Sequence, residues 1–134
     1  MSAVVADTHA LIWFMGETTR LSLTAQAALQ AAEDTQQPIY VPVIVIVELR
    51  YPVEKGAIQE ADYQRILAAL RDPSTVLVAH ELNLDQAESV TQIPREIVPD
   101  MPDRIIAATA LTLGLPLVTK DLKIRNLPNI ATIW

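Results

Sequence analysis

The sequence predicts a three-layer α/β/α sandwich, in which a mostly parallel sheet of about five strands lies between two layers of helices. Short β-branched apolar runs alternate along the chain with longer segments of helical periodicity, the order expected when right-handed helical crossovers join parallel strands. Hydrophobic residues make up 51% of the chain, whereas aromatic residues make up only 4%. This aliphatic composition suits helices packed on a parallel sheet.

We expect the whole chain, residues 1–134, to form a single domain. A chain of this length can bury roughly two-thirds of the surface that its unfolded form exposes, so one hydrophobic core is expected. No internal repeat or linker divides the sequence.

The opening segment predicts a strand followed directly by a helix. Residues 3–6 form a short apolar run typical of a strand buried on both faces, and Leu11, Ile12 and Phe14 follow at helical spacing. Asp7 lies at the junction. An acid there either caps the helix or lies at the edge of the sheet where ligands bind, and this residue alone does not decide between the two.

The remaining elements follow from short apolar runs and from helical periodicity. Further strands are expected at residues 39–41, 76–79, 117–119 and 130–133. Helices are expected at residues 22–34, 60–71, 84–93 and 103–113. Residues 94–102 hold three prolines and are expected to form a loop, and Gly114 is expected to end the last of these helices.

Residues 42–51 allow two interpretations. Their β-branched composition favours a strand, yet Pro42 also suits the first turn of a helix. The local pattern leaves both open.

The charge and the cysteine content exclude several classes of function. The net charge is −6, which argues against a protein that holds nucleic acid by an overall positive field. A polyanionic substrate would therefore need a divalent cation at the site. The chain has no cysteine, which excludes a disulfide framework, a thiolate zinc site and a cysteine nucleophile.

No feature of the sequence predicts a membrane partner. No apolar run approaches the ~20 residues of a membrane span, and the first residues lack the pattern of a signal peptide. We therefore expect a cytoplasmic protein.

Four acids lie at or near the predicted element boundaries. Asp7 ends the first strand, Asp121 follows the fourth, Asp103 opens a helix, and Glu48 lies in the apolar stretch after the second strand. Because the carboxyl ends of parallel strands share one edge of a sheet, these carboxylates can meet there. Clustered carboxylates repel one another and must take up protons or bind a cation. Oxygen ligands favour Mg²⁺ or Mn²⁺ over zinc.

The sequence resembles a known family in four segments. They are Val5 to Ile12 (VADTHALI), Val47 to Leu49 (VEL), Asp100 to Ala110 (DMPDRIIAATA) and Leu117 to Asp121 (LVTKD). In this order and spacing they resemble a PIN domain, and among PIN domains they are most similar to the VapC toxins of bacterial and archaeal toxin-antitoxin pairs. The resemblance extends from Val4 to Trp134.

The resemblance implies both a fold and a set of site residues. It implies that residues 43–51 form a helix, against their own β propensity. It also implies that four acids form a catalytic, metal-binding quartet: Asp7, Glu48, Asp103 and Asp121. Asp7 and Asp103 are expected to bind the ion directly, and the other two directly or through water. Asp100 and Thr119 are expected to contact these ligands rather than the ion itself.

The function implied by the resemblance is that of an endoribonuclease dependent on Mg²⁺ or Mn²⁺. Hydrolysis of RNA would leave a 5′-phosphate and a 3′-hydroxyl. A toxin of this kind is expected to be inhibited by a co-encoded antitoxin protein and to form a homodimer, with the first helices as candidate surfaces.

Three alternatives remain open. One is a housekeeping PIN nuclease in RNA processing, although the length, with no appended domain, favours the toxin. Another is a non-catalytic PIN-like binding module, which the intact set of four acids argues against. A phosphotransferase of the haloacid dehalogenase type needs a second Asp two residues after the first, where this chain has His9.

Some residues near the acids have both a structural and a functional interpretation. Arg50, Arg104 and Lys120 adjoin predicted site segments and can contact phosphate, whereas Arg50 and Arg104 are equally suited to solvent or to an ion pair. We expect His9 on a helix surface and Trp13 in the core or a dimer interface.

Overall fold

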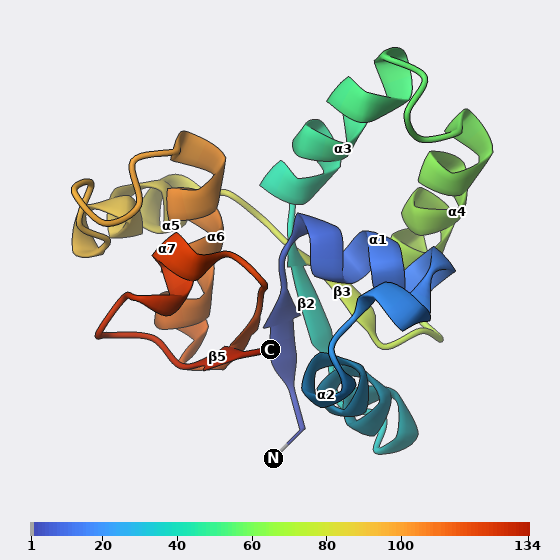
Figure 1. Ribbon diagram of the computed structural model, residues 1–134, viewed down its shortest axis with the longest axis horizontal. Coiled ribbons are helices and arrows are strands. Elements are labelled where there is room, and N and C mark those ends of the chain that lie inside the picture. Colours follow the sequence, from blue (N-terminus) through green and yellow to red (C-terminus); the bar gives the residue numbers. More distant parts are fainter. Residues whose placement is uncertain (1) are drawn as a thin grey trace.

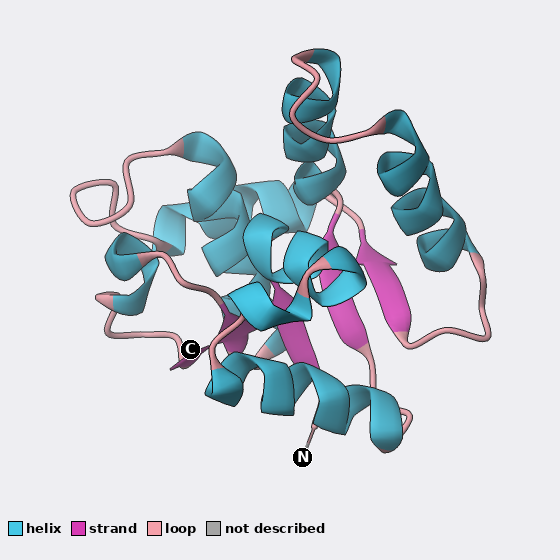
Figure 2. Ribbon diagram, turned by 45° about the vertical axis from the view of Figure 1, so that its right-hand side comes forward, coloured by secondary structure: helices cyan, strands magenta, loops and turns pink. Residues whose placement is uncertain are grey.

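The computed structural model describes residues 2–134, and it confirms the predicted α/β sandwich (Figure 1). The sheet has five strands in the order β3-β2-β1-β4-β5, and all neighbouring pairs are parallel. The strands are β1 (Val4–Ala6), β2 (Ile39–Pro42), β3 (Leu77–His80), β4 (Leu117–Val118) and β5 (Thr132–Ile133). Helices cover both faces of the sheet (Figure 2).

Helices make up most of the remaining structure. The α-helices are α1 (Thr8–Gly16), α2 (Leu23–Asp34), α3 (Ile44–Glu54), α4 (Glu60–Arg71), α5 (Leu84–Glu88), α6 (Met101–Leu113) and α7 (Leu122–Arg125), and short 3₁₀ helices follow α1 (Thr18–Arg20) and α5 (Ser89–Gln92). In Figure 1, α3 and α4 pack side by side and project from one end of the sheet, whereas α5, α6 and α7 lie on the other side of α1. Within residues 2–134 no helix has the length and apolar character that a membrane crossing requires.

The strand order places a crevice at the carboxyl ends of β1 and β4. The chain runs outward from β1 to β2 and β3, and then returns to add β4 and β5 on the opposite side of β1. Ligands of open α/β sheets bind where the strand order reverses in this way. The residues that follow β1 and β4 therefore occupy the position that the fold favours for a functional site.

The core is built on the central strands and α6. Val5 and Ala6 of β1 are completely buried, as expected for a strand covered on both faces. Ala107 and Ala108 of α6 are also completely buried, and α6 contacts β1, β2 and α3. These small side chains allow α6 to pack closely on the sheet, which holds its first turn at the crevice.

The ambiguous segment after β2 is a helix, as the family resemblance implies. α3 covers residues 44–54 and buries Val45 and Leu49, while Val47 and Tyr51 remain exposed. The contacts of α3 with α1, α6 and β2 override the β propensity of its sequence.

Two predicted helices need correction, and one helix was not predicted. α6 begins at Met101, two residues before Asp103, because Asp100 caps the helix and a proline is tolerated in the first turn. The helix expected over 84–93 stops at Glu88 and continues as a 3₁₀ helix. The four-residue α7 was not expected, because its short segment lacks a helical period. The predicted stop at Gly114 is confirmed by its φ of 66°.

Candidate metal centre and nucleic-acid cleft

A cleft of about 790 Å³ lies at the carboxyl edge of the sheet. It is bordered by residues of α1, α3 and α6 and by the segments that follow β1 and β4. Six acidic side chains line it: Asp7, Glu17, Glu48, Asp100, Asp103 and Asp121. The four acids of the predicted quartet thus reach one cleft from positions far apart in the sequence.

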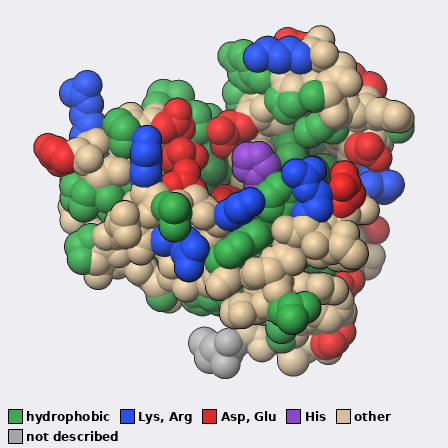
Figure 3. Space-filling model, in the orientation of Figure 1, with side chains coloured by type: hydrophobic (Ala, Val, Ile, Leu, Met, Phe, Trp, Pro, Cys, Tyr) green, Lys and Arg blue, Asp and Glu red, His purple; other side chains and the backbone are tan. Residues whose placement is uncertain are grey.

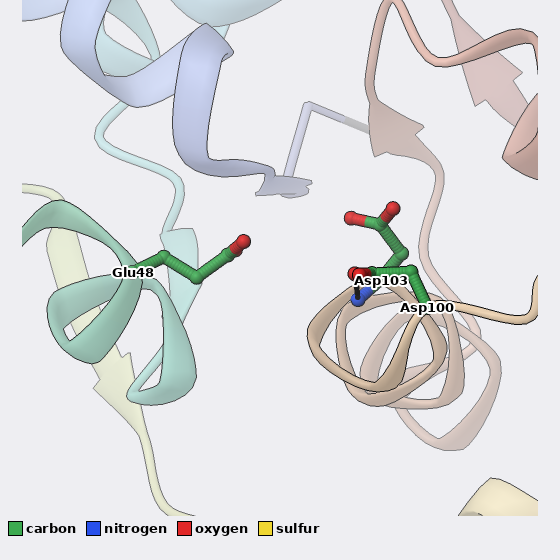
Figure 4. Close-up of side chains that lie close together, drawn as sticks. All are labelled: Glu48, Asp100 and Asp103. Atoms are coloured by element: carbon green, nitrogen blue, oxygen red, sulfur yellow. Dashed lines mark hydrogen bonds between the residues drawn. The ribbon is translucent and has the colours of Figure 1, made fainter. Parts of the chain in front are cut away.

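Three of these acids converge closely. Oxygen atoms of Glu48, Asp100 and Asp103 lie within 4.8 Å of one another. Glu48 points from α3 toward the two aspartates at the start of α6 (Figure 4). The sequence predicted that Asp100 supports the metal ligands without binding the ion itself. In the structure it lies beside Asp103 as a third converging carboxylate.

The direction of Glu48 is fixed by a neighbour on α1. The Thr8 hydroxyl donates a hydrogen bond of 2.7 Å to Glu48 Oε1. This bond joins two residues that are 40 positions apart in the sequence. It leaves Oε2 of Glu48 free of protein hydrogen-bond donors within residues 2–134.

Asp7 lies at the floor of the cleft, directly after β1. Its side chain is only 7% exposed. Asp7 Oδ1 accepts a hydrogen bond of 2.9 Å from the Ala10 backbone N–H, so Asp7 is the N-cap of α1. The Thr119 side chain favours the charged form of Asp7 and so offsets part of the rise in pKa that burial causes.

Asp121 lies on the same side of the cleft and also caps a helix. Its Oδ1 accepts hydrogen bonds of 2.8 and 3.2 Å from the backbone N–H groups of Lys123 and Ile124 at the start of α7. The Asp121 N–H in turn donates to Thr119 Oγ1 at 3.1 Å. The buried Thr119 side chain therefore contacts the Asp121 backbone and lies near the Asp7 carboxylate.

Burial and mutual repulsion disfavour the charged forms of Asp103, Asp7 and Glu48. Burial, followed by the charges of Asp100, Asp121 and Glu48, raises the pKa of Asp103 from 3.8 to about 7. Burial also raises the pKa of Asp7 and that of Glu48. A nearby cation would favour the charged forms and so lower each of these pKa values.

No basic side chain neutralises this charge in the described part of the chain. The ion pairs of residues 2–134 are Arg50 with Glu54, Arg50 with Glu60, and Arg65 with Asp62. All of them involve acids outside the cleft lining. The donor set of the converging acids is carboxylate oxygen, which fits a hard divalent cation.

The basic residues noted in the sequence differ in their contacts in the structure. Arg50 is paired with Glu60 at 2.8 Å, and the Arg104 guanidinium donates to the Val90 and Ile93 carbonyls, so both have structural partners. Lys120 lines the cleft.

Arg20 also lines the cleft and was missed by sequence reasoning. It lies in a polar connection without a motif, so no local signal identified it. Trp13 is 7% exposed, which places it in the core, one of the two positions expected for it, and His9 is exposed at the cleft, as expected.

The fold and the cleft define a PIN-type α/β domain, and comparison with known families agrees. Residues 4–130 match the PIN domain model, and the chain belongs to the PIN domain family. In an alignment of 136 positions that spans the whole of both chains, it is 30% identical to Ribonuclease VapC22 of Mycobacterium tuberculosis.

Solved structures of toxin-antitoxin proteins share this fold. A chain of VapBC2 from Rickettsia felis, crystallised with a DNA fragment from its promoter, is 18% identical with a TM-score of 0.71, and the match covers 97% of this chain and 96% of that one. A chain of a toxin-antitoxin complex from Klebsiella pneumoniae is 26% identical with a TM-score of 0.65, covering 96% of each chain.

Proposed function

We propose that this protein is a metal-dependent endoribonuclease that hydrolyses RNA phosphodiester bonds and acts as the toxin of a toxin-antitoxin pair. The observation that carries the proposal is the convergence of Glu48, Asp100 and Asp103 in a cleft that also holds Asp7 and Asp121. Membership of the PIN family and full-length similarity to a protein named as a ribonuclease support it.

The proposed metal ligands are Asp103 and Asp7, with Glu48 and Asp121 binding directly or through water. The position of Asp100 adds a fifth candidate ligand. Mg²⁺ or Mn²⁺, when bound, supplies positive charge to the scissile phosphodiester and an activated water as the nucleophile. The carboxylates would hold their oxygens in place for the ion.

Two hydroxyl groups are proposed to position these acids. Thr8 holds one oxygen of Glu48, and Thr119 accepts from the Asp121 N–H near the Asp7 carboxylate. Fixed ligands of this kind do not have to be ordered when the ion binds, which favours binding.

The charge of the chain is consistent with this mechanism. A protein with a net charge of −6 repels RNA as a whole, and a divalent cation at the cleft would supply the local positive field that brings a phosphodiester to the acids. Hydrolysis is expected to leave a 5′-phosphate and a 3′-hydroxyl.

The proposal includes partners and a location. We propose that residues 1–134 form one nuclease domain, that a cognate antitoxin inhibits it, that it forms a homodimer, and that it acts in the cytoplasm, where RNA is available. The similar structures are described as toxin-antitoxin assemblies, which supports the antitoxin. Light scattering of the purified chain, alone and with the antitoxin, tests both assemblies.

Cleavage of RNA by the purified protein tests the catalytic proposal. Wild type and Asp103→Asn are incubated with total RNA and with a single-stranded oligonucleotide, in Mg²⁺, in Mn²⁺ and in EDTA. Asp85→Asn is the matched control, because Asp85 also lies in the first turn of a helix but outside the cleft. We expect cleavage by wild type and by the control only with a divalent cation, and none by Asp103→Asn.

Equal cleavage in EDTA, or full activity of Asp103→Asn, would contradict the proposed mechanism. Inactivity of the wild type on every RNA, with either cation, would contradict the proposed ribonuclease function itself.

A further inference from the structure

A second cluster of side chains lies in the same cleft, away from the converging acids. The Arg20 guanidinium lies over the Trp13 ring, 4.7 Å from its centroid, and the Lys120 ammonium lies 5.6 Å from the same centroid. All three side chains line the cleft. Three separate parts of the chain therefore contribute to it: α1, the 3₁₀ helix that follows α1, and the segment after β4.

In the part of the chain that the structure describes, the two cations have no acidic partner. Within residues 2–134 neither Arg20 nor Lys120 takes part in an ion pair, although Glu17 lines the cleft as well. The chain has 10 Lys and Arg residues, and Arg20 and Lys120 are the ones that line the cleft. Both cations therefore lie in the cleft without a carboxylate partner among the described residues and can contact an anionic ligand there.

Trp13 holds the cations and is not itself open to a ligand. Its side chain is only 7% exposed, and its ring contacts the rings of His9 and Trp134, with centroids 5.3 and 5.9 Å away. A ring this buried cannot stack on an extruded base. It can restrain two flexible basic side chains through cation–π contacts, which lowers the entropy that they lose when they bind an anion.

We propose that Arg20 and Lys120, held on Trp13, form a phosphate-binding subsite for a backbone phosphate of the RNA strand next to the scissile bond. The inference rests on the proposed ribonuclease function and extends it to how the substrate is held. Lys120 precedes Asp121, and Trp13 lies on the helix that Asp7 caps. The subsite therefore lies on the Asp7 and Asp121 side of the cleft.

The charges around the cleft favour a phosphate as the occupant. Figure 3 shows a group of acidic side chains beside a histidine, with basic side chains on the other side of that histidine. An RNA strand entering the cleft meets repulsion on the acidic side, and phosphate contacts by Lys and Arg are the usual way in which proteins position a strand without reading its sequence. The subsite would set the register of the strand, so that the next phosphodiester lies at the carboxylates.

RNA binding without cleavage tests the subsite. The affinity of full-length protein for a fluorescent single-stranded RNA oligonucleotide is measured by anisotropy in EDTA over a range of salt concentrations. The variants are Arg20→Gln and Lys120→Gln, and the control is Arg71→Gln, which removes the same charge from an exposed position outside the cleft. Thermal unfolding of each variant checks that it is folded.

Each cleft variant is expected to bind about tenfold more weakly than wild type, as for the loss of one charged hydrogen bond. The slope of log affinity against log salt should also fall by about 0.7 for each phosphate of the single strand that the protein no longer neutralises. Arg71→Gln should change neither quantity. Arg20→Lys keeps the charge and should recover most of the salt slope.

The subsite would be overturned if Arg20→Gln and Lys120→Gln had the same affinity and salt slope as Arg71→Gln. If wild type still cleaved RNA, the proposed function would stand without it. Wild type that binds RNA through these cations but cuts no RNA would support the subsite and contradict the nuclease.

Discussion

Five of the six acids of the cleft fall into two groups that differ in how closely their carboxylates approach one another. Glu48, Asp100 and Asp103 bring oxygens within 4.8 Å of one another. Asp7 and Asp121 lie in the same cleft but outside this group, and each gives one oxygen, Oδ1, to backbone N–H groups at the start of a helix. The first group is defined by the closeness of its carboxylates, whereas both members of the second group cap a helix and lie apart from that cluster.

The comparison shows that capping a helix and binding a metal are compatible roles. Asp100 also caps a helix, because its Oδ2 accepts from the Asp103 N–H at 3.2 Å, yet it belongs to the converging group. In each of the three capping aspartates the hydrogen bonds to backbone N–H groups engage a single carboxylate oxygen. The other oxygen can bind an ion, so evidence for a cap is not evidence against a ligand.

Among the changes that test this comparison, the largest expected effect is that of Glu48→Gln on RNA cleavage. The amide keeps the size of the side chain and can still accept from Thr8, but it removes one charge from the converging group. We expect Mg²⁺-dependent cleavage to fall at least about a hundredfold, as for the loss of a metal-binding group. Initial rates of oligonucleotide cleavage measure it.

Glu81→Gln is the control for this change, since Glu81 is exposed and lies outside the cleft. Retention of more than half of the wild-type rate by Glu48→Gln would show that the converging group is not the metal site.

The second prediction compares one aspartate from each group. Asp100→Asn and Asp121→Asn both keep a side chain that can cap a helix. Because only Asp100 lies in the converging group, its substitution should raise the Mg²⁺ concentration for half-maximal cleavage about tenfold, and that of Asp121 should raise it less. Titration of cleavage with Mg²⁺ measures both, and the opposite order would make Asp121 the more direct ligand.

The sequence was sufficient for the fold and for bringing the four acids to one cleft. Alternating elements predicted the parallel sheet, and the shared edge of parallel strands placed Asp7 and Asp121 together. The helix at 44–54 needed the family resemblance, because its β-branched sequence becomes helical through burial of Val45 and Leu49 rather than through local propensity.

The details that separate the two groups of acids were not predictable from the sequence. The convergence of Asp100 with Asp103 depends on α6 beginning at Met101, and the aim of Glu48 depends on a hydrogen bond to a residue 40 positions away. No sequence pattern identified Arg20, because its position over Trp13 depends on tertiary packing.

A third prediction uses the raised pKa values. Between its ordinary pKa of 3.8 and its native value of about 7, Asp103 binds a proton in the native state but not in the unfolded state. Its contribution therefore stabilises the fold at low pH and is lost as the pH rises through about 7. The raised pKa values of Asp7 and Glu48 act in the same direction.

Without metal, the unfolding midpoint should thus be about 2 to 8 °C higher near pH 6 than near pH 8. Calorimetry of wild type and Asp103→Asn measures this difference, which should be smaller in the variant. Mg²⁺ favours the charged carboxylates and should stabilise wild type more near pH 8 than near pH 6. A midpoint that is as pH-dependent in Asp103→Asn as in wild type would remove Asp103 as the cause.

The smallest expected effect belongs to Thr8, which touches the converging group only through Glu48. Thr8→Val keeps the shape of the side chain but removes the hydroxyl that donates to Glu48 Oε1. The Glu48 carboxylate then samples more rotamers and must be ordered when the ion binds. We expect the Mg²⁺ requirement to rise about threefold to fivefold, with the cleavage rate restored at saturating Mg²⁺.

Thr8→Ser keeps the hydroxyl and should restore the wild-type Mg²⁺ requirement. The split between metal affinity and maximal rate distinguishes positioning from a direct part in the chemistry. A lower rate that saturating Mg²⁺ does not restore, in a folded Thr8→Val, would place the Thr8 hydroxyl at the reacting atoms. Thr8 of α1 would then belong with the groups that act in the reaction, rather than with those that position Glu48.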